Sequence, residues 1–230
     1  MFIRLLLSVF SLLWSPPQVR IPGPGGASPS ATAPAYINGG CAGGNGAQTA
    51  SINMTGANLY VLTVVGGTPT YTFSDTNSSS WSALQGSSGL LFSYAANVTG
   101  APDKFTLTAG GFPGFCVAGF SGMYTSSVYE SGTYVLNISP GTTTCQPGST
   151  TPATAGHQVF IAGLQFNNSP VISVNAPFST PPLQVNNLGG NYGNATSYYI
   201  QAGGGAQNST FNYAGGTAVQ GCWQAVFQGN

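Results

Sequence analysis

The chain has 230 residues, of which three are basic and three acidic, and its formal net charge is zero. This length allows one large all-β domain or two small ones, and it is long enough to bury a sizeable apolar core. Because nucleic-acid binding needs clustered Lys and Arg, the composition excludes an electrostatic nucleic-acid interface, and it argues against a polybasic membrane-surface patch.

The low charge does not indicate disorder. Disordered chains are poor in aromatic residues, whereas this chain has 13 Phe and 11 Tyr. Its 34 Gly and 16 Pro predict many short strands joined by tight turns. Such a neutral surface tends to self-associate near its pI, which suits a matrix or assembly protein.

Residues 1–35 are predicted to be a signal peptide followed by a Pro/Gly/Ser-rich leader. The apolar run Leu5–Trp14 is too short for a helix that spans a bilayer, which needs about 20 residues. Small residues offer cleavage sites after Ala27 and after Ala35. An incorrect start or an uncleaved anchor with a Pro-rich spacer stays an alternative. In every case we expect an exported protein with no membrane span after processing, extracellular or at the cell surface.

In chain order, the first half alternates or concentrates apolar residues in segments that predict strands, with no helical period outside the leader. The connection 75–84 is predicted to turn and to present Trp81 and Leu84. The predicted strands are 36–42, 48–54, 58–65, 70–75, 90–98, 103–110 and 115–120.

The order of these pieces is similar to that of a known group of proteins. A strand NLYVLTVV is followed by a D-T-N-x-x-x-W turn, then F-x-Y-A-x-N-V-x-G, K-F-T-L-T and A-G-F-S-G. Over about residues 50–125 this resembles a loosely defined group of secreted bacterial and phage-associated β-sandwich proteins of unknown activity. The resemblance implies the fold and export, and no activity.

Residues 123–156 are predicted to join two halves, with one strand at YVLNIS. The strands HQVFIAGLQF, VISVNA and PLQVNN follow. The segment Phe92–Gly122 then returns as Tyr198–Gly229, and an offset of 106 carries Phe105 to Phe211 and Cys116 to Cys222.

We therefore predict an all-β fold: one jelly-roll-like β-sandwich domain, 36–230, built from two duplicated Greek-key halves at about 36–122 and 140–230. It would have about eight core strands. Two separate immunoglobulin-like domains are the alternative.

The four cysteines fit an oxidising compartment. Cys41 lies 75 residues before Cys116, and Cys145 lies 77 before Cys222. Three pairings are open. We predict Cys41–Cys222 and Cys116–Cys145, because first and last strands often neighbour each other in a sandwich. No C-x-x-C pair occurs, and one histidine cannot complete a zinc set, so neither a metal nor a cofactor is expected.

Catalytic groups are scarce. A glycoside hydrolase needs two carboxyls, and with Asp103 placed in a turn only Asp75 and Glu130 remain. The single histidine, His157, begins a strand, and no G-x-S-x-G elbow accompanies it. We expect no enzyme, and a glycoside hydrolase is a remote alternative.

Aromatic residues are the richer resource, because sugars stack on exposed rings and amides bind their hydroxyls. For each candidate, packing in the core or a turn is the competing interpretation, and Trp223 is assigned to the core. The candidate ligand-binding residues are Trp81, Tyr124, Tyr129, Tyr134, Tyr192 and Tyr199.

The sequence thus favours a secreted or surface-displayed structural or assembly protein of a matrix or virion. A carbohydrate-binding module is the alternative. The expected partner is a glycan or a protein surface, including other copies of the chain, and no nucleic acid.

Overall fold

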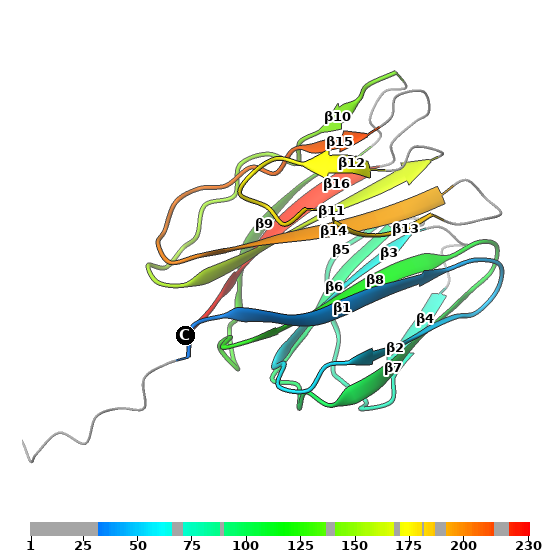
Figure 1. The fold of residues 1–230 in the computed structure, drawn as a ribbon, viewed down its shortest axis with the longest axis horizontal. Coiled ribbons are helices and arrows are strands. Elements are labelled where there is room, and N and C mark those ends of the chain that lie inside the picture. The colour runs from blue at the N-terminus through cyan, green and yellow to red at the C-terminus, as the bar shows by residue number, and fades with distance from the viewer. Residues whose placement is uncertain are drawn as a thin grey trace, which may run out of the picture. The chain divides into compact units, whose positions relative to one another are not determined.

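Four β-sheets, stacked face to face, make up the part of the chain described by this computed structural model (Figure 1). The described residues are 32–65, 71–87, 90–136, 141–167, 171–180, 182–186, 192–213 and 221–230. Within them the fold is all-β, as predicted, and no helix is long and apolar enough to cross a membrane. Of the predicted leader, only residues 32–35 are among them.

The first half of the chain forms two antiparallel sheets. The five-stranded sheet has the order β1-β8-β3-β6-β5, and the three-stranded sheet has the order β2-β7-β4. Their bounds are β1 Ala35–Gly43, β2 Gln48–Asn53, β3 Leu59–Val65, β4 Tyr71–Asp75, β5 Ser82–Ser87, β6 Leu90–Ala96, β7 Pro102–Ala109 and β8 Gly114–Ser121.

The second half forms two further sheets. The five-stranded sheet has the order β13-β14-β11-β16-β9, and the three-stranded sheet has the order β10-β15-β12. Their bounds are β9 Tyr129–Leu136, β10 Thr144–Cys145, β11 Gln158–Asn167, β12 Val171–Val174, β13 Leu183–Asn186, β14 Tyr192–Gln201, β15 Phe211–Tyr213 and β16 Gly221–Gln228.

The strand order of the first half recurs in the second when each strand number is raised by eight. Phe105 and Phe211 accordingly lie in matching strands, β7 and β15. The predicted total of about eight strands is wrong, because each half has eight of its own in the described residues. The strand β9, predicted to lie between the halves, is part of the second half's five-stranded sheet. The duplication and its Greek-key path stay predictions.

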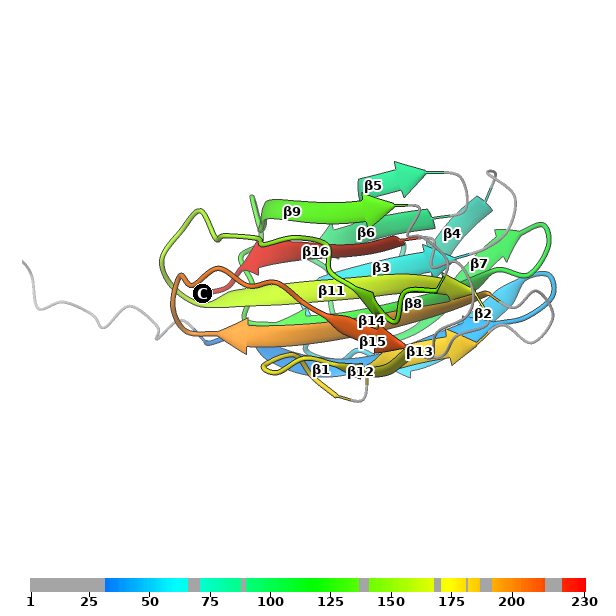
Figure 2. The ribbon, with the colours of Figure 1, turned by 90° about the horizontal axis from the view of Figure 1, so that it is seen from above.

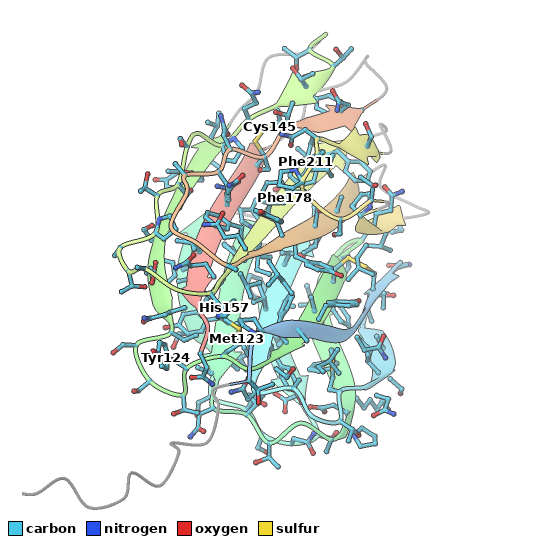
Figure 3. All side chains as sticks on the ribbon, turned by 60° about the vertical axis from the view of Figure 1, so that its left-hand side comes forward. Met123, Tyr124, Cys145, His157, Phe178 and Phe211 are labelled. Carbon is cyan, nitrogen blue, oxygen red and sulfur yellow. A yellow bond between two sulfur atoms is a disulfide. The ribbon has the colours of Figure 1, made fainter. Side chains whose placement is uncertain are left out.

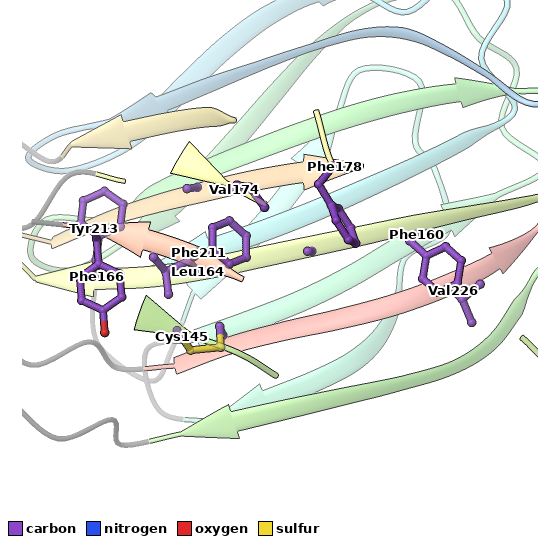
Figure 4. Packing of buried hydrophobic residues seen from close by; sticks show 12 residues of the cluster. Cys145, Phe160, Leu164, Phe166, Val174, Phe178, Phe211, Tyr213 and Val226 are labelled. Atoms are coloured by element: carbon purple, nitrogen blue, oxygen red, sulfur yellow. A yellow bond between two sulfur atoms is a disulfide. The ribbon is translucent and has the colours of Figure 1, made fainter. Parts of the chain in front are cut away.

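Three apolar cores separate the four layers. The outer core of the first half lies between its two sheets and includes Tyr60, Phe105 and Phe115. The central core lies between the two five-stranded sheets. The outer core of the second half includes Phe211, Phe178 and Val226, and Figure 4 shows Val226 beside Phe160, with Phe178 between that pair and Phe211.

The strand β3 illustrates why the sequence folds in this way. All seven of its residues are buried, because β3 belongs to an inner layer with a sheet on either side. Leu59 and Val61 face the central core, whereas Tyr60 and Leu62 face the outer core. A run that is apolar on both faces is what a doubly covered strand requires.

A buried polar contact joins the two halves across the central core. The Thr63 hydroxyl of β3 lies 2.8 Å from the Thr196 hydroxyl and 3.0 Å from Asn194 Oδ1, both in β14. Asn194 Nδ2 in turn donates to the backbone oxygen of Thr63 at 2.8 Å. Mutual satisfaction is what allows these groups to be buried.

The disulfides are Cys41–Cys116 and Cys145–Cys222. The predicted pairing, Cys41–Cys222 with Cys116–Cys145, is therefore wrong, although two bridges were expected. Cys41 and Cys116 lie opposite each other in the neighbouring strands β1 and β8. Each bridge closes within one half, because each half is a complete pair of sheets with its own core.

Candidate functional site

The two central sheets have two margins, and Figure 2 shows them on opposite sides of the stack. At one margin the edge strands are β1 and β13, and at the other they are β5 and β9. When the strand numbers of the first half are raised by eight, β1 corresponds to β9 and β5 corresponds to β13. The two margins are therefore equivalent places, and their side chains can be compared directly.

The margin between β1 and β13 is closed by direct packing. Gly39 has no side chain, and a Cβ there would lie 2.5 Å from Leu183 Cδ1 of β13. The rings of Tyr36 and Tyr198 stack at 4.6 Å between centroids and join the two sheets.

The margin between β5 and β9 contains a hollow of about 150 Å³, which we call the notch. Its lining comes from both five-stranded sheets, and four of its side chains are aromatic. The lining residues are Leu84, Phe92, Tyr129, Gly132, Thr133, Tyr134, Trp223, Gln224 and Ala225.

Two of the predicted binding residues, Tyr129 and Tyr134, meet at this notch. The Tyr129 ring lies 6.1 Å from Tyr94 and 5.9 Å from Phe227. Burial, and then the neighbouring Tyr94, raises the pKa of the Tyr129 hydroxyl, so it remains a neutral hydrogen-bond donor at physiological pH. Tyr134 is 50% exposed and offers a free ring at the mouth.

Trp223 forms part of the notch from the core side. Its assignment to the core is confirmed, since it is buried and its ring lies 5.6 Å from Phe92. The indole lies on Gly163, where any Cβ would collide with it. Its Nε1 is buried without a hydrogen-bond partner among the described residues. Sequence reasoning missed Trp223, Phe92 and Leu84 as lining residues, because only the pairing of edge strands brings them together.

Two other predicted binding residues pack inward. The Trp81 indole N–H donates to Asp75 Oδ2 at 2.8 Å, and its ring lies 5.0 Å from Phe73. Tyr199 packs on Phe160 and Phe178 at the second half's outer core. For both residues the structure agrees with the packing interpretation, and neither lines the notch.

The remaining two lie elsewhere. Tyr124 is exposed in the connection after β8, at the same end of the fold as Met123 and His157 (Figure 3). Tyr192 begins β14 opposite Asn167 in the backbone register, and its side chain is outside the described set. Of the five candidate aromatics whose side chains are described, only Tyr129 and Tyr134 line the notch.

The candidate catalytic carboxyls have local partners and lie in different layers. Asp75, at the end of β4, accepts from the backbone N–H of Ser79 at 3.0 Å as well as from Trp81. Glu130, in β9, accepts from the backbone N–H of Ala153 at 2.9 Å and from the Thr154 hydroxyl. Both act as loop acceptors, and their strands belong to the first half's outer sheet and the second half's inner sheet.

His157 has a structural contact as well. Its Nδ1 lies 2.9 Å from the backbone oxygen of Asn230. The notch therefore supplies aromatic faces and two phenol groups, and no carboxylate or imidazole belongs to its lining. Such a site can hold a ligand by stacking and a few hydrogen bonds.

No protein-family model, curated protein or solved structure matches this chain. The resemblance to secreted bacterial and phage-associated sandwiches therefore stays a prediction, and function rests on geometry alone.

Proposed function

We propose that this protein is an exported, non-enzymatic structural protein that assembles with copies of itself through the edge strand β9. The supporting observation is the position of its exposed apolar side chains. Among the described residues the exposed large hydrophobics are Tyr124, Tyr134 and Val135, and all belong to β9 or to the connection leading into it.

The character of β9 supports this assignment. Edge strands are commonly protected from pairing with another chain by Lys, Pro or inward charges. In β9 the one charged residue is Glu130, whose carboxylate is already bonded to a neighbouring loop. With a formal net charge of zero, the chain also lacks the repulsion that keeps proteins apart.

Two disulfides support export, because such bonds persist in oxidising compartments. They are compatible with the predicted signal peptide and with a role outside the cell.

The test is the dependence of mass on concentration, measured by light scattering near the pI of about 6.5. The wild-type protein is expected to associate, and Val135→Lys to stay monomeric, because an edge lysine opposes strand pairing. Thr108→Lys is the matched control: it adds the same charge at an exposed position of β7, the middle strand of an outer sheet. Equal association of both variants and the wild type would overturn the assembly proposal.

Carbohydrate binding at the notch is the second candidate, and the four aromatic side chains of the lining favour it. An exposed Tyr134 ring can stack on a sugar face while a phenol hydroxyl bonds a sugar hydroxyl. Screening on a glycan array followed by calorimetry tests it. Tyr134→Ala should abolish binding and Tyr124→Ala should preserve it, with little change between low and high salt because no charge takes part. An array without hits removes this candidate.

A further inference from the structure

The strand β9 has one free edge. Among the described residues it pairs with β16 alone, and no backbone group of a described loop bonds to the backbone of residues 130–136. The N–H and C=O groups on its outer side are therefore open to another strand. A second copy of the chain can use them, as the proposed assembly requires.

The two faces of β9 are fixed by its pairing with β16. Tyr134 lies opposite Trp223, which belongs to the central core, and Val135 lies opposite Cys222, which belongs to the second half's outer core. The two exposed apolar side chains of the strand are therefore on opposite faces. Because side chains alternate along a strand, Thr133 shares the face of Val135.

This alternation restricts how β9 can pair with itself. Copies of one chain most commonly associate about a two-fold axis, and an axis perpendicular to the sheet pairs the strand antiparallel to its own copy. Residues that lie directly opposite each other in antiparallel strands point to the same face. The axis must therefore pass through a residue of β9, because an axis between two residues would place opposite faces against each other.

The regular part of β9 leaves two residues for this axis. The register with β16 is interrupted between Tyr129 and Ser131, so residues 131–136 form the regular segment. The middle of this segment lies between Thr133 and Tyr134. One of these two residues is therefore on the axis when the pairing is as long as the segment allows.

The exposed apolar side chains decide between the two residues. With the axis at Thr133, Tyr134 would lie opposite Gly132 of the second copy, and Val135 opposite Ser131. With the axis at Tyr134, the two tyrosine rings lie opposite each other, and Val135 lies opposite Thr133. Aromatic pairs are stabilising cross-strand combinations, and β-branched residues pack well on a pleated surface. The axis at Tyr134 therefore covers both exposed side chains with suitable neighbours.

On the basis of the proposed assembly through β9, we infer that two copies pair β9 with β9 about a two-fold axis at Tyr134. The two five-stranded sheets then form one continuous sheet across the dimer. Glu130 is the one charged residue of β9, and the axis places the two Glu130 carboxylates at opposite ends of the pairing, where they do not repel each other. Such an interface is closed, so association through β9 stops at the dimer.

Oxidative cross-linking tests the axis in the wild-type protein. A peroxidase with hydrogen peroxide removes one hydrogen atom from each of two phenols, which join through a carbon–carbon bond while the peroxide is reduced to water. Tyr134 should couple to Tyr134 of the second copy and give a covalent dimer with dityrosine fluorescence, mapped by mass spectrometry. Tyr134→Phe should lose this product and still associate, because the ring remains. Tyr124→Phe, at the other exposed tyrosine of the described residues, should keep it.

Cysteine variants test the register. Thr133→Cys and Val135→Cys should each stay unlinked when oxidised alone, because each residue lies diagonally from its own copy, at about 7–8 Å. A disulfide needs Cβ atoms about 3.5–4.5 Å apart. A mixture of the two variants should form a disulfide-linked heterodimer, because residues 133 and 135 lie directly opposite each other.

The outcomes distinguish the axis from the assembly itself. A wild-type protein that stays monomeric at every concentration overturns both. A protein that associates beyond the dimer, couples through a different tyrosine, or links Thr133→Cys to itself overturns the axis at Tyr134 and leaves assembly standing. A mass that levels off at twice that of the monomer, with coupling at Tyr134 and the mixed disulfide, is the expected result.

Discussion

The two margins of the central layers are similar at the start of their edge strands, β1 and β9, and differ further along these strands. In β1, Tyr36 lies opposite Phe120, and in β9, Tyr129 lies opposite Phe227. The register is interrupted directly after each tyrosine. This shared bulge fixes the residue-by-residue correspondence between the two margins.

Five residues further along each edge strand, the margins diverge. Tyr36 leads to Cys41, which lies opposite Cys116, and Tyr129 leads to Tyr134, which lies opposite Trp223. The closed margin therefore has a disulfide where the open margin has a pair of aromatic residues.

The glycines of the two edge strands, Gly39 and Gly132, also differ in the neighbours that a side chain would meet. A Cβ on Gly39 would meet Leu183 of the facing sheet, whereas a Cβ on Gly132 would meet Gln224 and Tyr129 of its own sheet. The same arrangement of strands thus gives a closed margin or an open notch, depending on whether side chains of the facing edge strand fill the space between the sheets.

The largest expected effect comes from the disulfide of the closed margin. Cys41→Ala with Cys116→Ala should lower the free energy of unfolding by about 4 kcal/mol, because the bridge closes a long loop in the unfolded chain. Urea denaturation measures the loss. The double variant Cys145→Ala with Cys222→Ala is the matched control, since the sequence separations are 75 and 77 residues. An unchanged midpoint in the first variant would contradict the pairing.

The cysteines also show where sequence reasoning failed. The offset of 106 aligns Cys116 with Cys222, but Cys222 belongs to the outer core of its half. Cys116 lies opposite Thr63, whose side chain faces the other half, so Cys116 points inward. The bulge pairs match Phe120 with Phe227, an offset of 107, and this offset places Trp223 at the position of Cys116. The similar separations within the two cysteine pairs, 75 and 77 residues, therefore do not mean that the cysteines occupy equivalent positions in the two halves.

The strands themselves were easier to predict. Most were visible as short apolar or alternating runs, because each strand faces at least one core. The number of layers could not be predicted, because the sequence does not show that the inner faces of two complete sandwiches pack together. The packing of Trp81 could not be predicted for a related reason: the acceptor of its indole N–H, Asp75, becomes apparent only once the turn is folded.

The second prediction concerns the buried polar contact that joins the two halves across the central core. Thr63→Val should destabilise the protein by about 1–3 kcal/mol, because the Thr196 hydroxyl and Asn194 Oδ1 lose a buried partner. Thermal unfolding measures the change. Thr72→Val, at an exposed position of β4, is the control and should be nearly neutral. A neutral Thr63→Val would mean that packing alone joins the sheets.

The third prediction compares two half-buried leucines at equivalent edges. Leu183→Ala at the closed margin should cost about 1–2 kcal/mol, less than a fully buried leucine would. Leu84→Ala should cost less than about 1 kcal/mol, because its neighbourhood is already hollow. Denaturant titration of both variants gives the difference. Equal losses would show that the two margins are packed equally well.

The smallest expected effect comes from filling the notch. Leu84→Phe adds volume beside a hollow of about 150 Å³, so it should stabilise the protein by about 0.5–1 kcal/mol. The corresponding substitution Leu183→Phe should destabilise it by about 1–3 kcal/mol, because the space beside Gly39 is already occupied. Calorimetric midpoints distinguish the two signs. A filled notch should also lose any glycan affinity while self-association through Val135 persists, and this separates the two proposed functions of the margin. If both substitutions stabilised the protein, the closed margin would have to contain unfilled space. The proposed difference in packing between the two margins would then be wrong.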